Sequence, residues 1–124
     1  MKRDFISILD WTSEEIRSNL DFAVELKHQT KEGKCPQLLQ GKTFGLFFHK
    51  PSLRTRLSFE VGITQLGGTA IVLTEQDFKI GERETVSDVA RVMSRYVDCI
   101  LIRTFSHQMV LDLSKHATVP VVNI

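Results

Sequence analysis

Hydrophobic residues along the chain fall into two alternating patterns: short unbroken apolar runs, and longer stretches in which apolar residues recur at helical spacing. The runs that have the length of buried strands cover residues 43–48, 69–73, 99–102 and 119–122. The first run carries apolar side chains on both faces, which is typical of a parallel strand that is covered from both sides. With the other three strand-like runs, the sequence predicts a sheet of four strands.

Helical spacing fills the segments between these runs. Thr12 and Glu15 match a capping box, which predicts a helix start there, and Gly33 is its predicted end. The same spacing predicts further helices over residues 55–66, 86–97 and 106–113. In the first of these, Leu57 and Val61 are expected on the buried side. Strands that alternate with helices predict an α/β fold, an open parallel four-stranded sheet with helices on both faces.

Composition narrows the class of protein. The 124 residues suffice for one compact domain, which we expect to span 1–124. The formal net charge of +1 lacks the basic excess that a general nucleic-acid binder needs. No apolar run approaches the roughly 20 residues that cross a bilayer, and no signal peptide is recognisable, so we expect neither membrane insertion nor export. Cys35 and Cys99 lack metal-ligand spacing, which predicts no metal site and a reducing, cytoplasmic location.

Polar groups concentrate directly after the first and third predicted strands. In open parallel sheets, ligands collect beyond the carboxyl ends of the strands. In segment 49–56, Ser52 and Thr55 bring hydroxyls to a helix start, where free backbone N–H groups favour an anion. Arg54 adds a planar guanidinium suited to phosphate or carboxylate, and Arg103 follows the third strand. We therefore predict that Arg54 and Arg103 face one hollow that holds a small anion.

A simpler interpretation of the same segment needs no ligand. Ser52 would then be a helix cap, and Arg54 and Arg56 would be exposed cations that pair with Glu60. An arginine beside a helix N-terminus opposes the helix dipole unless an anion offsets it. The second cation expected at the matching strand end, Arg103, also favours the anion site.

Residues 49–60, His-Lys-Pro-Ser-Leu-Arg-Thr-Arg-Leu-Ser-Phe-Glu, closely resemble the carbamoyl-phosphate signature of the aspartate/ornithine carbamoyltransferase family. Further elements resemble the family in the same order, at 65–68, 81–91 and 95–104. The resemblance covers essentially the whole chain. Lys50 and the run 95–105 resemble the ornithine branch more than the aspartate branch, which stays the alternative.

The resemblance implies a reaction and a set of residue roles. The amine of ornithine would attack the carbamoyl carbon of carbamoyl phosphate, phosphate would leave, and citrulline would form in arginine biosynthesis, without a metal or organic cofactor. Ser52, Leu53, Arg54 and Thr55 would hold the phosphate. Arg103 would reach both the phosphate and the carbamoyl oxygen. Arg54 and Arg103 are the implied catalytic residues, because fixed donors aimed at developing charge lower the barrier.

Two positions depart from the family pattern. Leu53 stands where many relatives have threonine, so its backbone N–H remains but one hydroxyl is absent. Lys79 stands where ornithine-type relatives place a glutamine that enters the site from a neighbouring subunit of a trimer. The resemblance thus implies a homotrimer in which Lys79 acts in trans. The alternative for Lys79, Glu82 and Arg83 is a solvated charged loop.

The family pattern also extends further than this chain. Relatives continue into a His-Pro-Cys-Gln segment and a second domain that binds the amino acid, and neither is present here. We expect the chain alone to bind carbamoyl phosphate but to be incomplete for catalysis. His49, His107 and His116 are expected as surface or helix residues rather than as substitutes for the missing histidine. A non-catalytic module that binds anions or mediates oligomerisation is the alternative from another class.

Overall fold

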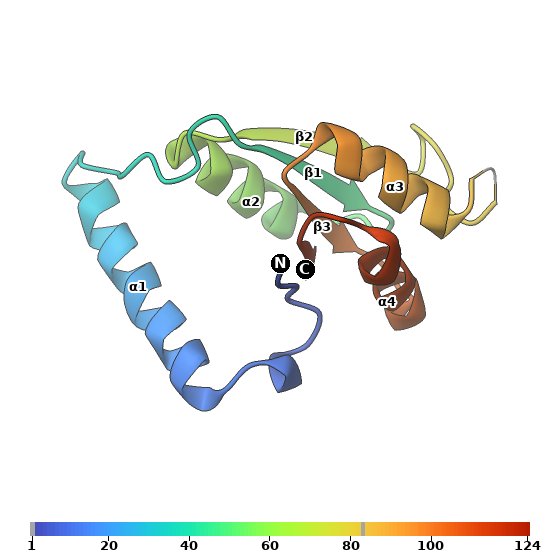
Figure 1. The fold of residues 1–124 in the computed structure, drawn as a ribbon. Coiled ribbons are helices and arrows are strands. Elements are labelled where there is room, and N and C mark those ends of the chain that lie inside the picture. Colours follow the sequence, from blue (N-terminus) through green and yellow to red (C-terminus); the bar gives the residue numbers. More distant parts are fainter. Residues whose placement is uncertain (1, 83) are drawn as a thin grey trace.

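The computed structural model describes residues 2–82 and 84–124 and folds them around one parallel sheet (Figure 1). The strands are β1 (Thr43–Phe48), β2 (Thr69–Thr74), β3 (Cys99–Arg103) and β4 (Val121–Asn123). The helices are a 3-10 turn η1 (Ile8–Asp10), α1 (Ser13–Lys31), α2 (Leu53–Gln65), α3 (Val86–Tyr96) and α4 (His107–His116). The strand order is β2-β1-β3-β4 with every pair parallel, which confirms the predicted open four-stranded sheet. Among the described residues, no helix combines the length and hydrophobicity that a bilayer crossing requires.

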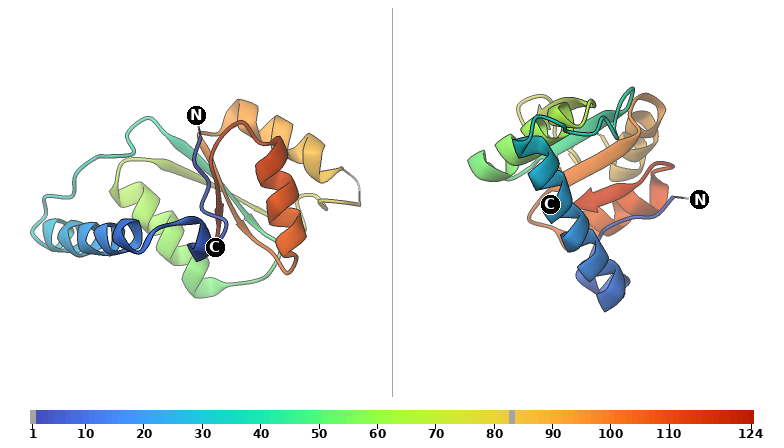
Figure 2. Two further views of the ribbon diagram at one scale, coloured as in Figure 1. Left: turned by 60° about the horizontal axis from the view of Figure 1, so that its bottom comes forward. Right: turned by 90° about the vertical axis from the view of Figure 1, so that its left-hand side faces the viewer.

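Helices cover both faces of the sheet, as the apolar runs predict (Figure 2). Phe47 of β1 packs on the face that α3 and α4 cover, with Val89 and Leu113 in the same cluster. Leu46 and Phe48 pack on the opposite face, which α2 covers through Ile63. Successive side chains of a strand point to opposite faces, so β1 needs apolar residues at both. This explains its unbroken hydrophobic sequence.

Polar side chains cap the starts of α1, α3 and α4. Thr12 Oγ1 accepts from the N–H of Glu15 at 3.1 Å, and the Glu15 carboxylate accepts from the N–H of Thr12 at 2.9 Å, which confirms the capping box. Thr85 and Ser106 accept in the same way at the heads of α3 and α4. Gly33, just beyond α1, has φ +74, a left-handed conformation that favours glycine after a helix.

Some details of the helix predictions are wrong. α2 begins at Leu53 rather than at residue 55, and Leu57 and Val61 are about half exposed because α2 turns Ile63 toward the sheet. Every residue of α1 is described, and none is buried. A cavity of about 330 Å³ lies between α1 and α2, and Figure 1 shows α1 set apart from the sheet. Spacing and a cap are enough to predict a helix, but its burial depends on a partner surface.

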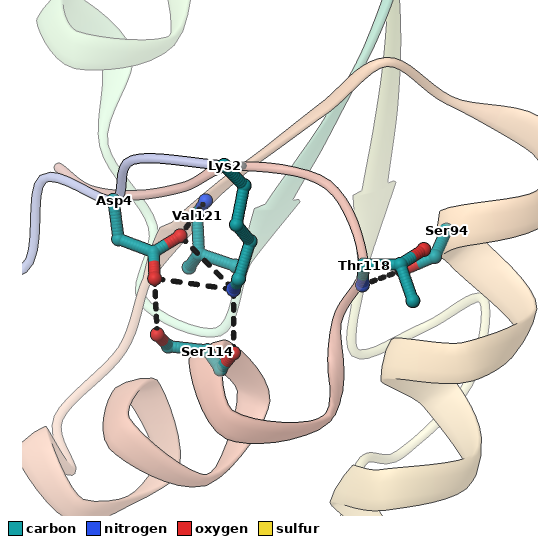
Figure 3. A network of polar contacts seen from close by, with 6 residues as sticks. All are labelled: Lys2, Asp4, Ser94, Ser114, Thr118 and Val121. Atoms are coloured by element: carbon teal, nitrogen blue, oxygen red, sulfur yellow. Dashed lines mark hydrogen bonds and ion pairs between the residues drawn. The ribbon is translucent and has the colours of Figure 1, made fainter.

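The N-terminal segment pairs with β4 through one parallel bridge and brings the two chain ends together (Figure 1). Asp4 lies at the centre of a polar network (Figure 3). Its carboxylate accepts from the Lys2 ammonium at 3.1 Å, the Ser114 hydroxyl at 2.7 Å and the N–H of Val121 at 2.8 Å. Burial opposes ionisation, but these donors together hold the pKa of the Asp4 carboxyl below its usual value. These hydrogen bonds hold the N-terminal segment against α4 and β4.

Candidate functional site

The connections of the sheet diverge at the carboxyl ends of β1 and β3, where an open parallel sheet is expected to form a crevice. The chain leaves β1 toward α2 on one face and leaves β3 toward α4 on the other. The last residues of these neighbouring strands, Phe48 and Arg103, are paired in register, and the N–H of His49 donates to the Arg103 carbonyl at 2.9 Å. Where connections diverge from adjacent parallel strands, a ligand can enter between them. Both segments predicted to carry the chemistry therefore begin at one edge.

Ser52 is the N-cap residue of α2, yet its side chain makes no capping hydrogen bond. Its backbone is extended, with φ −159° and ψ 112°. The N-cap side chains of α1, α3 and α4 all accept from a first-turn N–H. Ser52 therefore holds the cap position of α2 without the side-chain bond that the other three N-cap residues make. Its hydroxyl and the first-turn N–H groups of α2 are left for another acceptor.

A cavity of about 450 Å³ opens beside the head of α2. Two predicted residues line it, Ser52 and Leu53, and the Leu53 side chain is 72% exposed. The other lining residues come from the end of β1, from α2 and from the turn after β2: Phe48, His49, Pro51, Arg56, Thr74, Glu75 and Gln76. Thr55 is partly buried within the first turn of α2 and is not part of the wall. The cavity therefore joins β1, β2 and α2.

The two arginines at the head of α2 differ in their partners. Arg56 Nε donates to a Glu60 carboxylate oxygen at 3.1 Å, so the simpler interpretation holds for this residue. Arg54 is exposed and forms no ion pair with any residue that the structure describes. Arg54 belongs to the first turn of α2, at the positive end of the helix, and this turn carries no acidic residue to offset its charge, which favours an anion there.

Arg103 is the last residue of β3 rather than the first residue after it. Its Nε is buried and has no hydrogen-bond partner among the described residues. An unpaired buried donor is destabilising by about 1–3 kcal/mol, and an anion in the crevice would supply an acceptor. Neither Arg103 nor Arg54 lines the 450 Å³ cavity, so the expected hollow shared by both arginines is not seen there.

His49 is a residue of the site that the sequence analysis placed among surface and helix histidines, and for this residue that expectation is wrong. Its Nδ1 lies 2.9 Å from Thr104 Oγ1, and its Nε2 lies 2.5 Å from a Glu75 carboxylate oxygen. Thr104 follows β3 and Glu75 follows β2, so the imidazole connects the strands on either side of β1. Its position directly after a predicted buried strand was the signal in the sequence. His107 and His116 are the first and last residues of α4, as expected.

Lys79 lies in the loop between β2 and α3 and is exposed. Its ammonium is 3.6 Å from a Glu82 carboxylate oxygen, and both side chains are more than half exposed. Within one chain this is the solvated charged loop named above as the alternative. Arg83, the third residue of that alternative, lies outside the described residues. Over the described part of the chain, no group of three His, Cys, Asp or Glu side chains is placed to hold a metal ion.

Comparisons with known proteins identify the family of the chain. Residues 3–124 match the family model described as aspartate/ornithine carbamoyltransferase, carbamoyl-P binding domain. The ornithine carbamoyltransferase of Anoxybacillus flavithermus is 50% identical over 121 residues, which are 98% of this chain and 38% of the relative. That of Syntrophotalea carbinolica is 47% identical over 123 residues, 99% of this chain and 41% of the relative. The chain thus spans about two fifths of the length of these relatives.

Solved structures show the same likeness. The ornithine carbamoyltransferase from Pyrococcus furiosus superposes with a TM-score of 0.95 at 50% identity, covering 98% of this chain and 39% of that one. The catalytic subunit of aspartate transcarbamoylase from M. Jannaschii gives a TM-score of 0.87 at 35% identity, covering 99% of this chain and 40% of that one. Both similarities extend over essentially all of this chain.

Proposed function

The chain belongs to the aspartate/ornithine carbamoyltransferase family as its carbamoyl-phosphate-binding domain, and from this membership we propose that it holds carbamoyl phosphate for transfer to ornithine. One observation carries the proposal in the structure. The Ser52 hydroxyl at the head of α2 makes no capping bond and lines a cavity of about 450 Å³. A phosphate there would find a hydroxyl, free N–H groups and the positive end of a helix together.

In this proposal the residues after β1 and at the end of β3 have different roles. Ser52, Leu53 and Thr55 bind the phosphate oxygens through hydroxyl and backbone N–H groups, and Arg54 adds its charge. Arg103 reaches the phosphate and the carbamoyl oxygen. Charge builds on both as the ornithine amine attacks the carbamoyl carbon and phosphate leaves. Donors that are already in place stabilise that charge without reorganisation.

The unpaired Nε of Arg103 supports its role as an anion ligand. A charged hydrogen bond contributes about 1.5–3 kcal/mol net, and the donor has no competing partner to give up among the described residues. Its carbonyl is meanwhile held by the N–H of His49, so the strand end is fixed while the side chain is uncommitted. Such a residue is prepared for a ligand before the ligand arrives.

Ornithine is favoured over aspartate as the acceptor because ornithine carbamoyltransferases reach 50% identity, whereas the aspartate transcarbamoylase subunit described above reaches 35%. We propose that a second domain supplies the amino-acid site, that this domain alone is incomplete for catalysis, and that the citrulline formed enters arginine biosynthesis. Assays of a protein that carries this domain, with ornithine and with aspartate, decide between the branches. Turnover of aspartate alone would reject the ornithine assignment.

Assembly as a homotrimer belongs to the same proposal. The loop that carries Lys79 is exposed, so Lys79 could enter the site of a neighbouring copy. Light scattering at several concentrations measures the assembly, and a monomer that retains full activity would exclude a contact in trans. Cys35 and Cys99 are both free thiols, which supports the proposed location in a reducing cytoplasm.

Calorimetric titration tests the binding site directly, with carbamoyl phosphate and with inorganic phosphate as probes. We expect Arg54→Ala and Arg103→Ala each to weaken binding by roughly 100-fold, because each removes about two charged hydrogen bonds. Arg17→Ala is the matched control, since Arg17 is an exposed arginine on α1. Equal affinities in all of these variants would overturn the proposed site.

A further inference from the structure

The cavity beside α2 contains a group that does not suit a phosphate site. The Glu75 carboxylate lines the same cavity as Ser52 and Leu53. A phosphate that entered the cavity would meet a like charge, and like charges in a partly enclosed site repel more strongly than they do in bulk water. The Glu75 side chain is about half exposed, at the open side of the cavity wall. Something must compensate this carboxylate if the cavity is to accept an anion.

His49, which lines the same cavity, contacts that carboxylate. Its Nε2 is 2.5 Å from a Glu75 oxygen and can only donate there, because an ionised carboxylate has no proton to offer. Its Nδ1 is 2.9 Å from the Thr104 hydroxyl, which donates to a neutral ring and accepts from a protonated one. In either protonation state, both ring nitrogens have a partner.

Neighbouring groups fix the direction in which the imidazole points. The ring lies between Phe47, at 6.2 Å between ring centroids, and Phe105, at 6.1 Å in an edge contact. The Thr104 hydroxyl also accepts from the N–H of Ser106, at 3.4 Å. This bond links the partner of His49 Nδ1 to the start of α4. The His49 imidazole is therefore held in its orientation toward Glu75 by contacts with β1 and with the turn after β3.

We infer that His49 is a positioning residue of the phosphate site: it pairs with Glu75 and so keeps the cavity receptive to an anion. The inference rests on the proposed function, because it assigns a role within that same cavity. His49 acts through Glu75 and the turn after β3, and it need not touch the phosphate. The charged groups nearest in the fold do not replace it, since Arg56 pairs with Glu60 and Lys50 lies over the Phe105 ring at 5.3 Å.

A double-mutant cycle tests this role, with inorganic phosphate as the probe in calorimetric titrations of the chain. His49→Ala should weaken phosphate binding about tenfold, the loss that corresponds to about 1.4 kcal/mol. Glu75→Gln should bind phosphate at least as well as the unmodified chain. The double variant should recover the affinity of Glu75→Gln, because without the carboxylate nothing requires compensation. A double variant as weak as His49→Ala would overturn the inference.

A further variant and a second readout separate positioning from folding. His49→Gln keeps a donor toward Glu75 and should retain more phosphate affinity than His49→Ala, even if the alanine variant is less stable. In assays of a protein that carries this domain together with the second domain, His49→Ala should raise KM for carbamoyl phosphate and leave kcat nearly unchanged. If Arg54→Ala and Arg103→Ala abolish binding while the His49 variants do not change it, the inference alone fails. If the unmodified chain binds no phosphate, the proposed function fails with it.

Discussion

Ser52 and Ser106 occupy the same position at the heads of two helices, and alanine at each should have opposite consequences. Ser106 Oγ accepts from the N–H of Met109 at 3.2 Å, whereas the Ser52 side chain makes no cap bond. Losing a serine cap is destabilising by typically about 1 kcal/mol. For a chain of 124 residues, an unfolding entropy of about 2.1 cal/mol/K per residue converts that loss into a Tm lower by about 4 °C.

Ser52→Ala should therefore leave Tm within about 1 °C, because it removes no intramolecular bond of that kind. It should instead weaken binding of inorganic phosphate, since a hydrogen bond to a charged group contributes about 1.5–3 kcal/mol, or roughly 10- to 150-fold in affinity. Ser106→Ala should show the reverse, a lower Tm with phosphate affinity nearly unchanged.

Thermal unfolding followed by circular dichroism and calorimetric titration with phosphate give both quantities for both variants. The comparison is internally controlled because the residue removed is the same and each site lies one residue before a helix. If Ser52→Ala lowered Tm as much as Ser106→Ala and left phosphate affinity intact, Ser52 would be an ordinary cap. The argument for an anion at the head of α2 would then be refuted.

Three further predictions concern the scaffold. Phe47→Ala should lower the free energy of unfolding, measured by urea titration, by about 3–5 kcal/mol, because Phe47 is 1% exposed. Leu53→Ala should change the same free energy by less than about 0.5 kcal/mol, because Leu53 is 72% exposed. The lowered pKa of Asp4 contributes stability that is present above its ordinary value of 3.8 and is lost as the pH falls through the folded value. Asp4→Asn should therefore make the free energy of unfolding depend less on pH between pH 5 and pH 2. An unchanged pH profile would contradict this. Burial raises the pKa of the Cys99 thiol to about 11, so at about pH 8 roughly one Cys99 in a thousand is a thiolate. Iodoacetamide should therefore label Cys99 slowly, as followed by mass spectrometry. Rapid labelling would show that Cys99 is more accessible than the structure indicates.

The parts of the fold that could be predicted are those in which sequence neighbours decide the structure. The capping box of Thr12 and Glu15 forms as expected because its bonds join residues three apart. The strand at 43–48 was recognisable because both of its faces are buried. The exposed α1 and the half-exposed Leu57 show the limit, since helical spacing does not reveal which face finds a partner.

The candidate site, too, could be predicted from the sequence only in part. The motif at 49–60 identified the segment, and the structure then separated its arginines: Arg56 pairs with Glu60 and Arg54 does not. The contact of His49 with Glu75 was invisible in the sequence, because the two residues belong to segments joined by a whole helix and strand. Neither residue carries a local pattern that calls for the other.

The sequence by itself determined what is periodic, local or carried by a motif: the four strands, the capped start of α1, the parallel α/β class and the motif segment after β1. The tertiary structure alone decided what meets at that segment. It placed β2 and β3 on either side of β1, so that Glu75 and Thr104 both reach His49. It also left the Ser52 hydroxyl without a capping bond at the head of α2. The physical reason is that periods and caps depend on residues a few positions apart, whereas contacts across a sheet depend on strand order, which brings distant segments to one edge.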